Sequence, residues 1–171
     1  MLGYIVSESR GAGDVLLGAV AQRLRAQGIS LAGAVQVNVE RGAGRKCDME
    51  LHILSGYDVV RISQNLGALA QGCRLDAHGL ERAVGLTSVA LQQNPALLII
   101  NKFGKQEMEG RGFRPLIGEA LGADIPVLTC IGAGMLPDFL AYAGDIGERL
   151  ACDVDTVLRW CARARAYKAP P

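Results

Sequence analysis

Short apolar segments alternate with longer amphipathic segments along this chain, and residues typical of turns separate them. Buried strands are predicted by continuous apolar runs at 2–7, 31–38, 96–101 and 125–131. The run at 96–101 is apolar on both faces, so we expect it at the centre of a parallel sheet. Two further segments, 48–54 and 58–63, are joined by Ser55-Gly56 and predict a β-hairpin.

The segments between these runs predict helices and two polar loops. Apolar residues at helical spacing predict helices at 14–27, 77–93, 113–122, 136–144 and 153–166. Asp76 is placed to cap the second of these helices, and Asn94-Pro95 to end it. Polar residues and glycines predict loops at 40–46 and 102–112, of which we expect the first to be mobile.

Strands that alternate with helices predict a doubly wound α/β fold with a mainly parallel sheet. The segment 48–63 adds an inserted antiparallel hairpin to that sheet. A chain of 171 residues is long enough to bury a full core, and no repeat or linker divides it. We therefore expect a single domain over residues 1–171.

The composition narrows the classes of function. The formal net charge is +1, which argues against a nucleic-acid partner. The first residues lack the features of a signal peptide, and no apolar run has transmembrane length, so we expect a cytoplasmic protein without a membrane partner. The five cysteines are scattered and odd in number, which predicts free thiols in a reducing compartment. With only two histidines, we expect no metal site of the zinc type.

The first candidate site is the turn between the first strand and the first helix, at Ser7 to Asp14. A strand, a glycine-containing turn and a helix N-terminus form the architecture of a phosphate-binding loop. We predict that an anion is held there by Ser9, Arg10, Gly11, Ala12 and Gly13. Asp14 stands where a phosphate-binding lysine is expected, and Val15 where a Mg²⁺-binding hydroxyl is expected. Alternatively, Asp14 simply stabilises the first helical turn through the helix dipole.

The second candidate site follows the central strand, at 101–113. In phosphate-transferring proteins an aspartate that binds Mg²⁺ ends this strand, often followed by a glutamate. Here Asn101 and Lys102 stand at those positions. Together with Lys105 and Arg111, they form a cluster that suits an anion clamp. Alternatively, this is a solvated loop in which Glu107 and Glu109 pair with the cations.

The third candidate site combines Cys47-Asp48-Met49 with Ser63-Gln64-Asn65 and with the segment 72–76, which contains Cys73. If the hairpin brings Cys47 and Cys73 together, they could form a soft-metal or redox site. The alternative is that both are small buried thiols.

The order and spacing of these segments resemble the small thermophile-type P-loop nucleoside triphosphatases. That family carries Asp-Glu-Ile-Gly-Pro-Met-Glu where this chain has residues 101–107, and only Gly104 and Glu107 are shared. Gly11 and Gly13 match the phosphate loop, whereas Glu8, Asp14 and Val15 depart from it. The resemblance implies a P-loop-like α/β fold with degenerate Walker motifs.

The segment 101–113 also resembles the motif Asn-Lys/Arg-Phe-Gly-Lys-x-Glu-x-x-Gly-x-Gly-Phe of a bacterial family of unassigned function. The segments 47–49 and 72–76 fit the same family. Its members are often encoded beside molybdate-transport genes. The resemblance therefore implies a role in the handling of molybdenum or tungsten.

Two functional hypotheses follow. The first is an oxyanion-binding protein for molybdate or tungstate, without catalytic residues, in which the phosphate-loop residues named above act together with Asn101, Lys102 and Lys105. The second is a divergent nucleoside triphosphatase or nucleotide-binding protein, with Glu107 as base if it is an enzyme. In both, the partner is a small anion. An interaction module, or a homo-oligomer, is a third reading. We also expect the exchange Asp14→Lys with Val15→Thr to leave the fold undisturbed.

Overall fold

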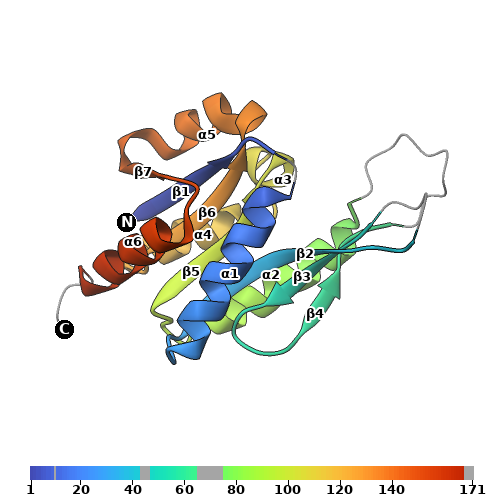
Figure 1. Ribbon diagram of the computed structural model, residues 1–171, viewed down its shortest axis with the longest axis horizontal. Coiled ribbons are helices and arrows are strands. Elements are labelled where there is room, and N and C mark those ends of the chain that lie inside the picture. The colour runs from blue at the N-terminus through green and yellow to red at the C-terminus, as the bar shows by residue number, and fades with distance from the viewer. Residues whose placement is uncertain (10, 43–46, 65–74, 168–171) are drawn as a thin grey trace.

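The computed structural model describes residues 1–9, 11–42, 47–64 and 75–167. Its centre is one seven-stranded sheet with the strand order β4-β3-β2-β5-β6-β1-β7 (Figure 1). The strands are β1 (Leu2–Ser7), β2 (Leu31–Val39), β3 (Asp48–Ile53), β4 (Val59–Arg61), β5 (Leu97–Phe103), β6 (Val127–Gly132) and β7 (Gly147–Leu150).

Five neighbouring strands of the sheet are parallel to one another, and two further strand pairings are antiparallel. β5 pairs with β2 on one side and with β6 on the other, and β1 lies between β6 and β7, all in parallel. β3 is antiparallel to both β2 and β4. The predicted mainly parallel sheet with an inserted hairpin is therefore confirmed, and the fold has a layout consistent with P-loop nucleoside triphosphatases.

Helices cover both faces of the sheet. The longer ones are α1 (Ala12–Ala26), α2 (Ala77–Leu91), α4 (Arg114–Gly122), α5 (Leu136–Ala143) and α6 (Val154–Ala166). Apolar side chains of α1 and α6 share one buried cluster, whereas those of α2, α4 and α5 share the cluster on the opposite face. Single-turn segments complete the fold at α3 (Lys105–Met108), η1 (Ala133–Met135) and η2 (Gly144–Ile146).

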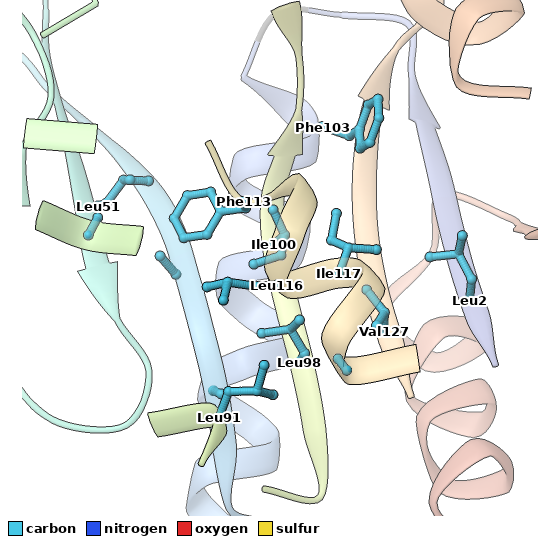
Figure 2. Close-up of a cluster of buried hydrophobic side chains, with 14 of the residues drawn as sticks. Leu2, Leu51, Leu91, Leu98, Ile100, Phe103, Phe113, Leu116, Ile117 and Val127 are labelled. Atoms are coloured by element: carbon cyan, nitrogen blue, oxygen red, sulfur yellow. The ribbon is translucent and has the colours of Figure 1, made fainter. Parts of the chain in front are cut away.

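The central strand is buried on both faces, as the sequence predicts. Leu97, Leu98, Ile99 and Ile100 have no exposed surface. Leu98 and Ile100 meet Leu116 and Ile117 of α4 in the cluster that Figure 2 shows. The rigid centre of the molecule thus fixes the end of β5, where the candidate site begins.

Several helices and strands begin or end at other residues than the sequence predicts. β6 begins at Val127 rather than at 125, because Pro126 has no N–H to donate to the ladder. α1 begins at Ala12 rather than at 14, since Gly11 adopts φ +83° and turns the chain into the helix. The predicted loop 102–112 is not entirely a loop: β5 continues to Phe103, and α3 occupies 105–108.

β7 is the strand that the sequence analysis missed. It has four residues, of which only Leu150 is both apolar and buried. Part of the predicted mobile loop (43–46), Arg10 and the segment 65–74 lie outside the described residues. Within the described ranges, no helix is long and apolar enough to cross a lipid bilayer.

Candidate ligand site at the carboxyl edge of the sheet

A pocket of about 710 Å³ opens at the carboxyl ends of β1 and β7. One wall is the turn that leads from β1 into α1, and the other is the segment that leads from β7 into α6. It is lined by Val6, Ser7, Glu8, Ser9, Ala12, Arg149, Leu150, Ala151 and Cys152. Ligands of open parallel sheets bind at such carboxyl ends. The predicted phosphate loop therefore forms half of a cavity, and the unpredicted β7 leads into the other half.

Within the turn between β1 and α1, which is the predicted phosphate loop, Ser7 holds the backbone in place. The Ser7 hydroxyl donates to the backbone carbonyl of Ser9 (2.7 Å) and accepts a hydrogen bond from the N–H of Gly13 (3.2 Å). A Cβ at position 13 would lie 2.2 Å from the sulfur of Cys130, so only glycine fits there. The N-cap residue of α1 is Gly11, which has no side chain to cap the helix, so Ser7 is the side chain that bonds its first turn. The helix dipole at this end favours an anion.

Asp14 lies in the first turn of α1, but it is not a solvated capping residue. Its side chain is 8% exposed and accepts hydrogen bonds from three side-chain amides. Asn101 donates at 3.1 Å, Asn38 at 2.9 Å and Gln36 at 3.5 Å. The expectation that Asp14→Lys leaves the fold undisturbed does not suit this setting, because a lysine there would face amide donors instead of acceptors.

Asn101 is held on the other side of this cluster. It is 2% exposed, and its Nδ2 donates to Asp14, which fixes the orientation of the amide group. Its Oδ1 has no donor among the described residues. Val15, by contrast, is 75% exposed. The predicted Mg²⁺ site would need a hydroxyl at position 15 and a carboxylate at position 101. Val15 has no hydroxyl, and Asn101 carries a neutral amide whose N–H group donates to Asp14.

Glu107 organises the segment that follows β5. Its side chain is 4% exposed and accepts hydrogen bonds from the N–H of Gly104 (2.9 Å) and the N–H of Phe113 (3.1 Å). Gly112 has φ +59°, and a Cβ there would lie 2.2 Å from Glu107 Oε1. Each carboxylate oxygen thus accepts a hydrogen bond from a backbone N–H group. Glu107 is therefore not available as a general base or as an ion-pair partner for the surface cations.

The cations of this segment differ in their surroundings. Lys105 is 82% exposed and lies 3.9 Å from Glu109, which also binds Arg111. Lys102 is exposed and makes no ion pair within the described ranges. Burial and the Asp14 charge raise the pKa of Cys130 to about 12, and the Lys102 charge opposes that rise. The sulfur of Cys130 lies against Gly13, at the start of α1.

The structure places the third candidate region in an ion-pair network. The buried Asp48 binds Arg41 and Arg61 and accepts a hydrogen bond from Ser63. Burial raises the pKa of Asp48, but the two guanidiniums outweigh it and hold that pKa below its usual value. Cys73 lies outside the described residues, so its predicted approach to Cys47 stays a prediction. The described side chains form no group of three or more His, Cys, Asp and Glu suited to a metal ion.

Four residues of this edge were missed by the sequence reasoning. Arg149 and Cys152 line the pocket, and Gln36 and Asn38 hold Asp14. Gln36 and Asn38 could have been identified from the sequence, because they are polar residues at alternate positions near the end of an apolar strand. Arg149 and Cys152 could not have been identified in this way, since the sequence did not predict that residues 147–152 form a strand and the segment that follows it.

Comparison with known proteins identifies relatives. A family described as "Protein of unknown function (DUF2478)" matches residues 2–160. "Molybdenum import ATP-binding protein ModC 2" of Bradyrhizobium diazoefficiens is 36% identical over 148 residues. That alignment covers 86% of this chain but 16% of that protein, so the chain corresponds to a small part of its relative. No solved structure gives a significant match to the chain.

Proposed function

The chain belongs to the DUF2478 family, and we propose that it binds a nucleotide without hydrolysing it, in the pocket between the β1–α1 turn and the β7–α6 segment. The observation that carries the proposal is the cavity of about 710 Å³ against the start of α1. Ligand sites of drug size occupy about 300–1,000 Å³. A tetrahedral anion alone would leave most of this volume empty.

The charges around the pocket support a phosphate-bearing ligand. The N-terminus of α1 presents the positive end of a helix dipole, and the N–H groups of Ala12 and Gly13 there bond Ser9 and Ser7 in the absence of a ligand. Arg149 lines the cavity and has no ion-pair partner in the part of the chain that is described. An unpaired guanidinium can hold a phosphate through two parallel hydrogen bonds. Lys102 at the end of β5 does not line the pocket, and its positive charge would act on a ligand there only over a longer distance.

The absence of metal ligands at two positions supports binding without hydrolysis. The side chain of Val15 carries no oxygen, and Asn101 donates its amide to Asp14. Phosphoryl transfer depends on a metal ion and a residue that orients the attacking water. Glu107, the candidate for that role, uses both oxygens on backbone N–H groups.

A thermal-shift screen with AMP, ADP, ATP and the guanine series tests the proposal. A ligand present at 100 times its Kd stabilises the native state by about 2.7 kcal/mol. We expect a rise in Tm with at least one nucleotide and no release of phosphate in the presence of Mg²⁺. Multiple turnovers that survive Glu107→Gln would point to a hydrolytic site of another kind.

A second function is favoured by one comparison. The relative named "Molybdenum import ATP-binding protein ModC 2" suggests molybdate or tungstate as the ligand, held at the start of α1 by Ser9, Gly11 and Lys102. The same screen includes molybdate and tungstate, with sulfate as a control of equal shape and charge. Stabilisation by molybdate but by neither sulfate nor any nucleotide would favour this function over the first.

A further inference from the structure

We infer that the pocket binds guanine nucleotides in preference to adenine nucleotides, and that Glu8 makes this distinction. The inference rests on the proposed nucleotide site. The two walls of the pocket carry opposite charges, because Glu8 is the one acid and Arg149 the one base among its described lining residues. A ligand that suits both walls therefore combines an anionic group with a group that donates hydrogen bonds.

Both charges are available to a ligand. Glu8 in the turn after β1 and Arg149 on β7 are exposed. Within the described ranges neither side chain has an ion-pair partner, and the two do not pair with each other across the pocket. A few polar groups on an otherwise apolar lining are what fixes the orientation of a bound small molecule.

The phosphate group suits the wall of Arg149 better than the turn. The backbone N–H groups of Ala12 and Gly13 already bond Ser9 and Ser7. The carboxylate of the turn would repel a phosphate, whereas a guanidinium can bind one through two parallel hydrogen bonds. With its phosphate at β7, a nucleotide directs its base toward the turn and Glu8.

Guanine and adenine differ in what they present to a carboxylate. The Watson–Crick edge of guanine carries two adjacent donors, N1–H and the N2 amino group, which match the two acceptor oxygens of Glu8. The same edge of adenine carries one amino donor beside the lone pair of N1, which the carboxylate would repel. Selectivity thus comes from a repulsion as well as from an attraction. Val6 and Leu150 add apolar surface to the lining for the purine ring.

A magnesium ion bound to the phosphates is the competing explanation for Glu8. A carboxylate is a common ligand of Mg²⁺, and an ion held in this way would favour neither base. Titrations in EDTA separate the two explanations, because they remove the ion and leave the contact between Glu8 and the base.

Calorimetric titration of the wild-type protein with GDP, IDP and ADP in EDTA tests the inference. We expect GDP to bind at least about tenfold more tightly than ADP, which corresponds to about 1.4 kcal/mol. IDP should lie between them, since hypoxanthine keeps N1–H and lacks the N2 amino group. Glu8→Gln should remove most of the ratio between GDP and ADP, because an amide can also donate to N1 of adenine.

Two further variants serve as controls. Glu81→Gln removes the charge of an exposed acid on α2 and should leave both affinities unchanged. Arg149→Ala should weaken GDP and ADP by similar factors and so leave their ratio unchanged. Cys152 is exposed and lines the pocket, so its rate of labelling by N-ethylmaleimide, followed by peptide mass spectrometry, reports occupancy. GDP should slow that labelling more than ADP at equal concentration.

The outcomes that would overturn the inference are distinguishable. ADP that binds as tightly as GDP overturns the selectivity and leaves the nucleotide site standing. A preference for GDP that survives Glu8→Gln overturns the role of Glu8. Binding of GDP without protection of Cys152 overturns the placement of the ligand in this pocket. No binding of any of the three nucleotides overturns the proposed function and the inference together.

Discussion

Asn101 at the end of the central strand donates a hydrogen bond of 3.1 Å from its Nδ2 to the Oδ1 of Asp14 in the first turn of α1. In the P-loop pattern that the sequence resembles, these two positions hold an aspartate and a lysine. Here the first position is neutral and the second is negative, so the polarity of the pair is reversed. The reversed pair keeps a bond between the central strand and the phosphate loop while the charges needed for Mg²⁺ and phosphate are lost.

A double-mutant cycle tests this pairing. Asp14→Lys should destabilise the protein because its ammonium would face three amide donors, and Asn101→Asp should do so because two carboxylates would meet. Leaving buried polar groups unpaired costs about 1–3 kcal/mol. The double variant restores opposite charges. We therefore expect its loss in the free energy of unfolding to be smaller than the sum of the losses in the two single variants. Urea unfolding of the four proteins measures the coupling, and strictly additive losses would show that the two positions do not interact.

Glu107 should matter for stability and not for chemistry. In Glu107→Gln, one of the two backbone N–H groups at Gly104 and Phe113 meets an amide nitrogen instead of an oxygen. We expect a loss of about 1–3 kcal/mol in the free energy of unfolding. The control is Glu109→Gln, which removes a carboxylate that pairs with Lys105 and Arg111 near the surface. Equal losses in the two variants would contradict the assigned role of Glu107.

Substitution of Lys102 and substitution of Lys105 should have different effects on ligand affinity. Lys102→Ala removes an exposed cation at the end of β5 that makes no ion pair among the described residues, and a charge-assisted hydrogen bond from it to a ligand would be worth about 1.5–3 kcal/mol. Lys105→Ala removes a cation that already pairs with Glu109, so we expect a smaller change in affinity. Titration of both variants with the best ligand from the screen makes the comparison. A larger loss for Lys105→Ala would reverse our assignment.

The buried thiol of Cys130 should make the protein less stable at high pH. Burial and the nearby Asp14 raise the pKa of Cys130 from 9.0 to about 12 in the folded state. Between these values the unfolded chain releases the thiol proton and the folded chain retains it, so the free energy of unfolding falls as pH rises. Unfolding curves above pH 9 should therefore decline less steeply for Cys130→Ala than for the wild type. Parallel pH profiles would show that this thiol contributes nothing to the decline.

The sheet could be predicted largely because its strands carry continuous apolar runs. β5 is apolar on both faces and lies centrally, as expected. β7 escaped prediction because it is short and has a single buried apolar residue, Leu150, so its position depends on pairing with β1 rather than on its own sequence. That pairing is a tertiary effect, which no local pattern records.

The candidate site was predicted in part. Gly11 and Gly13 indicated the turn correctly, since Gly11 has a φ of +83° and a Cβ at Gly13 would clash with the sulfur of Cys130. The partners of Asp14 could not be inferred, because Gln36 and Asn38 lie on another strand and approach Asp14 only after folding. The role of Glu107 could have been found, because a glutamate three residues after Gly104 has the spacing of a capping box.

The most direct test of the nucleotide-binding account is a calorimetric titration of the wild-type protein, Arg149→Ala and Arg82→Ala with ADP and GDP in the absence of metal. Arg149 lines the pocket, whereas Arg82 is an exposed arginine on α2 that serves as the control. The account predicts saturable binding with one site per chain, weakened by Arg149→Ala and unaffected by Arg82→Ala. Absence of binding at millimolar nucleotide, or equal binding by all three proteins, would contradict it.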